Sequence, residues 1–315
     1  MKVLIFALLM ALVGCSSIQK VATRSTTPIF QNASHKLMRE PSWEFFKASN
    51  PGNLKFMEMI YYSDTNNTEL LGLLVKGYAG YAFGVLETLH FREELSGKES
   101  SKWKQEAITI YTKALDYGLE YLQTKNITRA DLLNFDDIEL AKRLDKNLDR
   151  EDYIPVLYFA QVWGSLINLQ KDNVALVAQV PKVKTLFDWI CSKDQNIENG
   201  VCDMFFAQYE ASRPRMLGGD PAKAEELYKT AMEKYPKNLL IRLSYIQYMV
   251  LPGFEEGKYE DQASFLRKEF VKFENQNRDS LENKSEYLLF EDLNLFNAIA
   301  KKRFEIIEKN KIKIF

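Results

Sequence analysis

From Ser42 onward, apolar residues recur at intervals of three and four positions, and the few prolines lie at element boundaries. This spacing places apolar side chains on one face of a helix, and no stretch shows the sustained alternation of a half-buried strand. The pattern predicts helices at about residues 67–90, 101–125, 153–170, 174–179, 182–191, 220–235, 238–250, 259–273 and 285–309. We therefore expect one all-α domain over residues 42–315.

Glycines have two roles in this pattern. Gly77, Gly80 and Gly84 recur at helical spacing within the first predicted helix, where each costs about 1 kcal/mol of helix propensity. Such a row indicates that a neighbouring helix approaches closely. Later in the chain, Gly218-Gly219 precedes Asp220-Pro221, which predicts a tight turn and then a helix start. Asp accepts hydrogen bonds from the free N–H groups of a first turn, and Pro needs no partner there.

Two segments resemble the second helix of a tetratricopeptide repeat. That helix carries a small, an aromatic and another small residue, then a proline, at fixed offsets. One segment matches all four offsets and another matches three: Ala224, Tyr228, Ala231 and Pro236, then Ala107, Tyr111 and Ala114. The matches predict a TPR-like helix-pair repeat array, an α-α superhelix, although a related α-solenoid would satisfy them too.

The first residues have the pattern of a bacterial lipoprotein signal. Lys2 precedes the apolar run from Val3 to Val13, and Gly14 lies next to Cys15. Residues 1–14 are therefore expected to form a signal peptide, and lipidation at Cys15 would anchor the mature chain. An ordinary secretory signal with an incidental cysteine is the alternative.

The residues that follow suggest where the anchor lies. Residues 15–41 are polar, rich in Ser and Thr and aperiodic, which predicts a flexible tether after the lipidated Cys15. Ser16 favours sorting to the outer membrane, on its periplasmic face, and retention in the inner membrane stays open.

Composition narrows the classes of partner. Hydrophobic residues make up 46% of the chain and charged residues 27%, as in a globular protein. Without Lys2 there are 41 Lys and Arg against 43 Asp and Glu, so the mature chain has a net charge near −2. No basic excess points to nucleic acid.

The remaining cysteines are Cys191 and Cys202. An even number of cysteines in an oxidising compartment favours a disulfide across the turn between them. Two buried free thiols are the alternative.

Few residues are suited to catalysis. Only His35 and His90 are available for a histidine-based triad or metal site, and His35 falls in the predicted tether. No phosphate-binding glycine loop and no nucleophile elbow occur. We expect no catalysis, no metal and no cofactor.

Four residues are candidates for binding a ligand or partner. Arg213 and Arg215 bracket a proline ahead of the glycine turn, where guanidinium groups can meet an anionic ligand or a partner's carboxylate. Their alternative role is to neutralise nearby acidic residues. Tyr158 and Trp163 can line a ligand cavity or belong to an ordinary core.

The order of segments, taken together, resembles one family of transport lipoproteins. The signal precedes these segments: Pro51-Gly52-Asn53-Leu54, Leu70-Leu71 to Phe83, Tyr158-Phe159-Ala160, Trp163-Gly164, Val180-Pro181-Lys182-Val183, and Arg213 to Pro221. This arrangement, over residues 42–300, resembles the TRAP-transporter T-component (TatT) family. The chain departs from the pattern by lacking the terminal proline of most repeats and by carrying Pro252-Gly253 before a late helix.

The resemblance implies a periplasmic, membrane-tethered helical protein that associates with the solute-binding subunit of the transporter. It also implies a homotrimer whose cavity or pore takes a small apolar or amphipathic ligand. Arg213 and Arg215, as described above, allow an anionic ligand as well. The expected role is therefore assistance of ligand uptake without catalysis. A TPR scaffold for cell-envelope assembly is the alternative, and an envelope hydrolase is disfavoured by the missing catalytic groups.

Overall fold

The computed structural model describes residues 23–282 and 291–315, and every regular element within them is a helix. The predicted all-α fold is thus confirmed. The signal peptide and Cys15 lie outside the described residues. The elements after the N-terminal helical residues 23–37 are α2 (Trp43–Ser63), α3 (Thr68–Tyr81), η1 (Ala82–Leu86), α4 (Glu87–Leu95), α5 (Lys102–Thr124), α6 (Arg129–Asn134), α7 (Asp137–Asn147), η2 (Arg150–Asp152), α8 (Tyr153–Leu169), α9 (Val174–Val177), α10 (Val180–Lys193), η3 (Ile197–Asn199), α11 (Val201–Ser212), η4 (Arg215–Leu217), α12 (Pro221–Lys234), α13 (Leu239–Tyr245), η5 (Ile246–Val250), α14 (Glu256–Glu282), η6 (Glu291–Leu293) and α15 (Asn294–Ile314).

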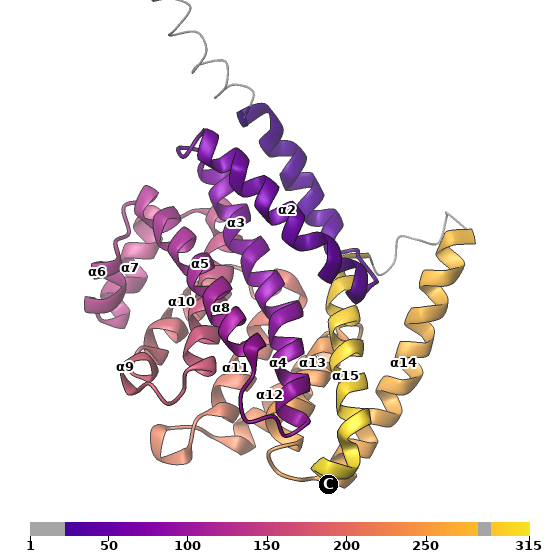
Figure 1. Cartoon of the computed structure of the whole chain (residues 1–315). Helices are drawn as coiled ribbons and strands as arrows, with labels where there is room; N and C mark the ends of the chain where they lie inside the picture. The colour runs from indigo at the N-terminus through magenta and orange to yellow at the C-terminus, as the bar shows by residue number, and fades with distance from the viewer. Residues whose placement is uncertain (1–22, 283–290) are drawn as a thin grey trace, which may run out of the picture.

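Two hydrophobic clusters organise these helices. The first contains residues of α3, α5, α8 and α10, and the second contains residues of α13, α14 and α15. Helix α3 packs against α5 and α8, while α15 packs against α13 and α4 (Figure 1). The stretch α3-η1-α4 is long and apolar enough to cross a membrane by composition. Its burial against these neighbours identifies it as the central helix of the fold.

Part of the predicted tether is not a flexible linker, because residues 23–37 form a helix. The Thr27 hydroxyl is buried and accepts a 2.6 Å hydrogen bond from the Asn67 amide, and Arg24 pairs with Asp64 at 3.0 Å. Thr27, one of the Ser and Thr residues that suggested a linker here, thus contacts the α2–α3 turn. The ordered domain therefore begins earlier than residue 42.

The aromatic and small residues of the two repeat matches are buried at helix contacts. Ala107, Tyr111 and Ala114 lie on α5, which packs on α3 and α8. Ala224, Tyr228 and Ala231 lie on α12, which packs on α11. These contacts agree with close helix pairing, and the TPR-like superhelix stays a prediction.

The predicted close approaches hold for two of the three spaced glycines. A methyl group on Gly77 would lie 2.6 Å from a Leu54 carbon, and one on Gly84 would lie 2.9 Å from an Ile299 carbon. Gly80 is the exception, because a methyl group there would meet no atom within 4 Å. The prediction of helix contact was therefore wrong at Gly80, which faces open space.

A disulfide joins Cys191 at the end of α10 to Cys202 at the start of α11, with the two Cα atoms 5.9 Å apart. Replacing both cysteines with alanine is expected to lower the free energy of unfolding by about 2–3 kcal/mol, because the bond restricts the unfolded chain. Urea unfolding of both proteins with and without dithiothreitol measures this. Dithiothreitol should destabilise the unmodified chain alone, and equal stability of the two proteins would contradict the prediction.

Glu58 joins α2 to α5 and makes stability depend on pH. Tyr117 and Lys113 donate to its Oε1 atom, and Lys55 donates to Oε2 at 2.8 Å. Burial raises the pKa of this carboxyl, but these donors outweigh burial and lower it to about 2.

The contribution of Glu58 should be present above the unfolded pKa of about 4.5 and lost as the pH falls toward 2. We expect Glu58→Gln to cost about 2–3 kcal/mol at pH 7 and almost nothing near pH 2. Urea unfolding across this pH range measures the difference. Exposed Glu99, mutated to Gln, is the matched control, and a pH-independent cost of Glu58→Gln would refute the assignment.

Candidate functional site

A cavity of about 780 Å³ lies inside the helical array. Most of its lining comes from the N-terminal helix, α2, α3, α8, α10, α11 and α15, so it touches both hydrophobic clusters. Sites for small molecules usually have volumes of about 300–1,000 Å³. The cavity is thus large enough for a ligand of moderate size.

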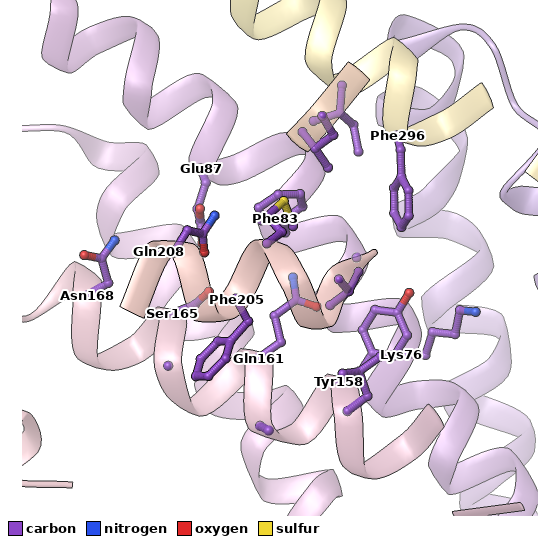
Figure 2. A pocket seen from close by; sticks show the side chains of 18 of the residues that line it. Lys76, Phe83, Glu87, Tyr158, Gln161, Ser165, Asn168, Phe205, Gln208 and Phe296 are labelled. Carbon is purple, nitrogen blue, oxygen red and sulfur yellow. The ribbon is translucent and has the colours of Figure 1, made fainter. Parts of the chain in front are cut away.

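Most of the cavity wall is apolar. Phe83, Phe205 and Phe296 contribute rings from three different elements, η1, α11 and α15 (Figure 2). Aliphatic residues such as Leu37 and Ile299 extend this surface. An apolar ligand body would be favoured here by removal from water, at roughly 25 cal/mol per Å².

The lining includes solvent-exposed residues in two regions. One region contains Ala33 of the N-terminal helix with Asn53 and Phe56 of α2. The other contains Asn168 at the end of α8 and Leu217 in η4. The cavity therefore reaches the surface near both regions.

A stripe of uncharged polar residues runs along α8, an otherwise apolar helix. Gln161, Ser165 and Asn168 follow helical spacing and all line the cavity (Figure 2). Gln208 of α11 also lines it, held by a 2.8 Å hydrogen bond from its amide nitrogen to Ser244. The cavity is therefore apolar with hydrogen-bonding groups on one side.

Glu87 lines the cavity at the start of α4, next to this polar stripe (Figure 2). Tyr111 donates a hydrogen bond to its Oε1 atom, and an Arg303 nitrogen lies 3.8 Å from Oε2. Burial raises the pKa of the carboxyl, while Arg303 and Tyr111 oppose the rise. Burial, with Glu87 nearby, also raises the pKa of the lining residue Tyr248 to about 12.

Two π-helical segments contribute to this part of the cavity. Segment η1 interrupts the helix between α3 and α4, and η5 follows α13. A π-turn shifts the backbone hydrogen-bonding register. In η1 the carbonyl of Phe83 accepts from Arg303 at 2.6 Å, and the carbonyl of Gly84 accepts from Trp43 at 2.7 Å. The buried polar groups near Glu87 are therefore held by α15 and α2.

Tyr158, one of the predicted binding residues, lines the cavity on α8. The Lys76 ammonium lies 5.2 Å from its ring centroid and pairs with Glu198 at 2.9 Å. Both charges are largely buried, and Lys76 also lines the cavity. Burial, with Glu198 nearby, raises the pKa of Tyr158 well above its usual value.

Trp163, by contrast, is not among the residues that line the cavity. It is buried, packs against Phe159 and donates a 2.9 Å hydrogen bond from its indole to Gln179. Tyr158 and Trp163 are five positions apart on α8, about 140° around the helix axis, so their side chains face different neighbours. Its position is that of a core residue.

The two predicted arginines occupy different environments. Arg213 lines the cavity, pairs with Glu210 at 2.9 Å and stacks on Tyr209 with its guanidinium carbon 3.7 Å from the ring centroid. The geometry agrees with the local-neutralisation alternative for Arg213. Arg215 is exposed on η4 and does not line the cavity.

The glycine turn fixes Arg213 in place. Gly218 has a φ of +83°, and a methyl group on Gly219 would lie 1.9 Å from the Arg213 carbonyl oxygen. Asp220 then accepts hydrogen bonds from the backbone of Ala222 and Lys223 at 3.0 and 3.1 Å. The predicted helix start is therefore confirmed.

Asn50 was not predicted and has an unusual environment. This α2 residue lines the cavity and is 2% exposed, and its side-chain nitrogen has no hydrogen-bond partner among the described residues. A buried donor normally has a partner. Within the same residues, no group of three or more His, Cys, Asp or Glu side chains is placed to hold a metal ion.

The fold and the cavity define the class of this molecule, an all-α protein with an internal ligand-sized cavity. Residues 40–270 match the family model of the TRAP transporter T-component, and the chain belongs to this family. It is thus a component of a TRAP transport system. A comparison with curated proteins gives no match.

Proposed function

We propose that this chain binds the solute-binding subunit of a TRAP transporter and holds an apolar or amphipathic ligand in its cavity during uptake, without catalysing a reaction. Family membership supports the transport role. The observation that carries the ligand role is the apolar cavity of about 780 Å³ that reaches the surface in two regions.

The anchor at Cys15 is part of the same proposal. A lipid on Cys15 would hold the mature chain at the periplasmic face of the outer membrane. The helix at residues 23–37 lines the cavity with Leu37 and its neighbours. The segment that leads away from the proposed anchor is therefore part of the cavity wall. A homotrimer, as the resemblance implies, belongs to the proposal too.

The surface around η4 is the region where we expect the solute-binding subunit to dock. Met216 and Leu217 are 91% and 57% exposed, and exposed Arg215 lies beside them. Leu217 also lines the cavity, so a partner bound here would cover one of the regions where the cavity reaches the surface. Aromatic residues, Met and Arg are enriched at protein interfaces.

Binding of the purified solute-binding subunit to the mature chain, measured by biolayer interferometry, tests this proposal. The double variant Arg215→Glu, Met216→Asp should weaken binding by about tenfold or more, as loss of a central contact does. Exposed Ile138 on α7 provides the matched control, Ile138→Asp. Absence of binding, with recovery of envelope-assembly proteins from extracts instead, would favour the scaffold alternative.

Light scattering of the same mature chain measures its mass. A trimeric mass would support the proposed assembly, and a monomeric mass at all concentrations would contradict it.

A further inference from the structure

The charged side chains that line the cavity interior are all paired within the protein. Lys76 pairs with Glu198 at 2.9 Å, and Arg213 pairs with Glu210 at the same distance. Glu87 accepts from Tyr111 and lies beside Arg303, whose side chain is 5% exposed. The other charged lining residues, Lys171 and Asp172, are exposed at the surface. The described interior therefore presents no free charge to a ligand.

Uncharged polar groups are available to a ligand. Gln161 and Ser165 lie one turn apart on α8, and Gln208 faces the same space from α11 (Figure 2). The Asn50 side-chain nitrogen lines the cavity without a partner. Gln161 and Asn50 can donate hydrogen bonds to hydroxyl, ester or amide oxygens, and the side-chain oxygens of Gln161 and Gln208 can accept them. The Gln208 amide nitrogen already donates to Ser244, and the Ser165 hydroxyl already bonds to Glu87.

Charged and uncharged ligand groups differ in the free energy that they lose when they leave water for this cavity. A carboxylate or ammonium group entering this cavity would lose its hydration without gaining a free counter-charge, which is expensive in an apolar site. Competition for Lys76 would leave Glu198 buried without its partner. A hydroxyl, ester or amide group loses less and regains its hydrogen bonds from the amide and hydroxyl side chains.

We propose that the cavity selects an uncharged amphipathic molecule, with a long apolar body and hydroxyl, ester or amide groups along one edge. The polar edge lies against Gln161, Ser165 and Gln208, and the apolar body lies against the phenylalanine rings. This inference rests on the proposed function, because it names the ligand class of the same cavity.

The test uses the whole mature chain with Cys15→Ser, which retains every residue of the described fold. A neutral fluorescent probe, N-phenyl-1-naphthylamine, reports occupancy of the cavity, and ligands of one chain length compete with it. These are dodecanol, monolauroylglycerol, dodecanoate and dodecylammonium. The two neutral ligands should displace the probe at about tenfold lower concentration than either charged ligand. A tenfold ratio corresponds to about 1.4 kcal/mol, which is the size of the penalty for one buried polar group without a partner.

Variants separate hydrogen bonding from simple hydrophobicity. Gln161→Leu should weaken monolauroylglycerol binding about five- to tenfold and leave probe binding unchanged, since only the polar contact is lost. Gln208→Leu should have the same effect on monolauroylglycerol, and urea unfolding accompanies it because this variant also loses the hydrogen bond to Ser244. Gln105→Leu, at an exposed position of α5, is the matched control. Glu198→Gln removes the partner of Lys76 and should strengthen dodecanoate by about tenfold through the freed ammonium.

The outcomes distinguish the two proposals. The neutral-ligand inference is overturned if the probe binds but dodecanoate displaces it at the same concentration as the neutral ligands. It is also overturned if the leucine variants leave the affinity for monolauroylglycerol unchanged. In both cases the cavity keeps its role as a ligand site. If the probe does not bind the correctly folded chain, the ligand role under the proposed function fails, and this inference fails with it.

Discussion

Replacing Arg303 with methionine is expected to lower the free energy of unfolding by about 3–5 kcal/mol, because it leaves a buried carboxylate without its counter-charge. Arg303 is 4% exposed on α15, and its guanidinium donates to the Phe83 carbonyl at 2.6 Å and to the Thr88 hydroxyl at 2.9 Å. Glu87 lies beside it. The substitution removes all of these interactions at once.

The position of Arg303 in the fold enlarges this effect. It connects α15, near the end of the chain, to the π-helical segment η1 in the central helix. Its guanidinium carbon also lies 4.4 Å from the Phe83 ring centroid, and Phe83 lines the cavity. Loss of Arg303 therefore affects both the helix contact and the cavity wall.

Urea unfolding followed by circular dichroism measures the change, and a double-mutant cycle assigns it. Glu87→Gln removes the charge that Arg303 balances, so Arg303→Met should cost less in that background, by about 1–3 kcal/mol. Arg92→Met on α4 is the control, because Arg92 is exposed and a surface charge should contribute less than about 1 kcal/mol. Equal effects of the two methionine variants would show that the buried network does not stabilise the fold.

Helical periodicity carried most of the fold prediction, because burial selects apolar residues at three- and four-residue spacing. The helices α5, α8 and α12 show this clearly, with bounds within a few residues of those expected. The bounds of α2 and α7 were not predicted, because α2 contains Pro51 and has an exposed apolar face, and α7 is mostly charged. Their N-caps, Ser42 and Asp136, were the remaining signals.

The candidate site was only partly predictable, because its residues resemble those of ordinary helices. Tyr158 was a candidate either for a cavity wall or for an ordinary core, and it lies at the cavity wall. Gln161 and Ser165 look like chance polar interruptions until α11 is placed opposite them. Glu87 and Arg303 are 216 positions apart in sequence and would each be assigned to the surface by charge. Only tertiary packing shows that they meet inside the protein.

Gly80 provides the most direct test of the cavity, because it lies on α3 and faces it. Gly80→Phe should place a ring in the open space and weaken probe binding by more than about tenfold, since a filled site loses the apolar contacts of its ligand. The protein should still fold, because a methyl group at this position meets no atom within 4 Å. Fluorescence titration and circular dichroism measure the two properties.

The alanine variants give an independent check on the same geometry. Gly80→Ala should raise the free energy of unfolding by about 0.5–1 kcal/mol through helix propensity. Gly118→Ala should instead destabilise the protein by about 1–3 kcal/mol, because its methyl group would lie 2.3 Å from a Phe159 carbon. If Gly→Ala raises the free energy of unfolding at Gly80 and lowers it at Gly118, the space beside Gly80 is open. A fold that simply tolerated added methyl groups would not be destabilised at Gly118.

Gly52→Phe controls for the added ring itself, because Gly52 lies on α2, is exposed and does not line the cavity. It should leave probe affinity unchanged. If Gly80→Phe and Gly52→Phe bind the probe equally well, the ligand does not occupy the space beside α3. If Gly80→Phe alone loses the probe and still binds the solute-binding subunit, ligand binding and partner docking are separate properties of the chain, as expected from the distinct positions of Gly80 and the exposed surface at η4.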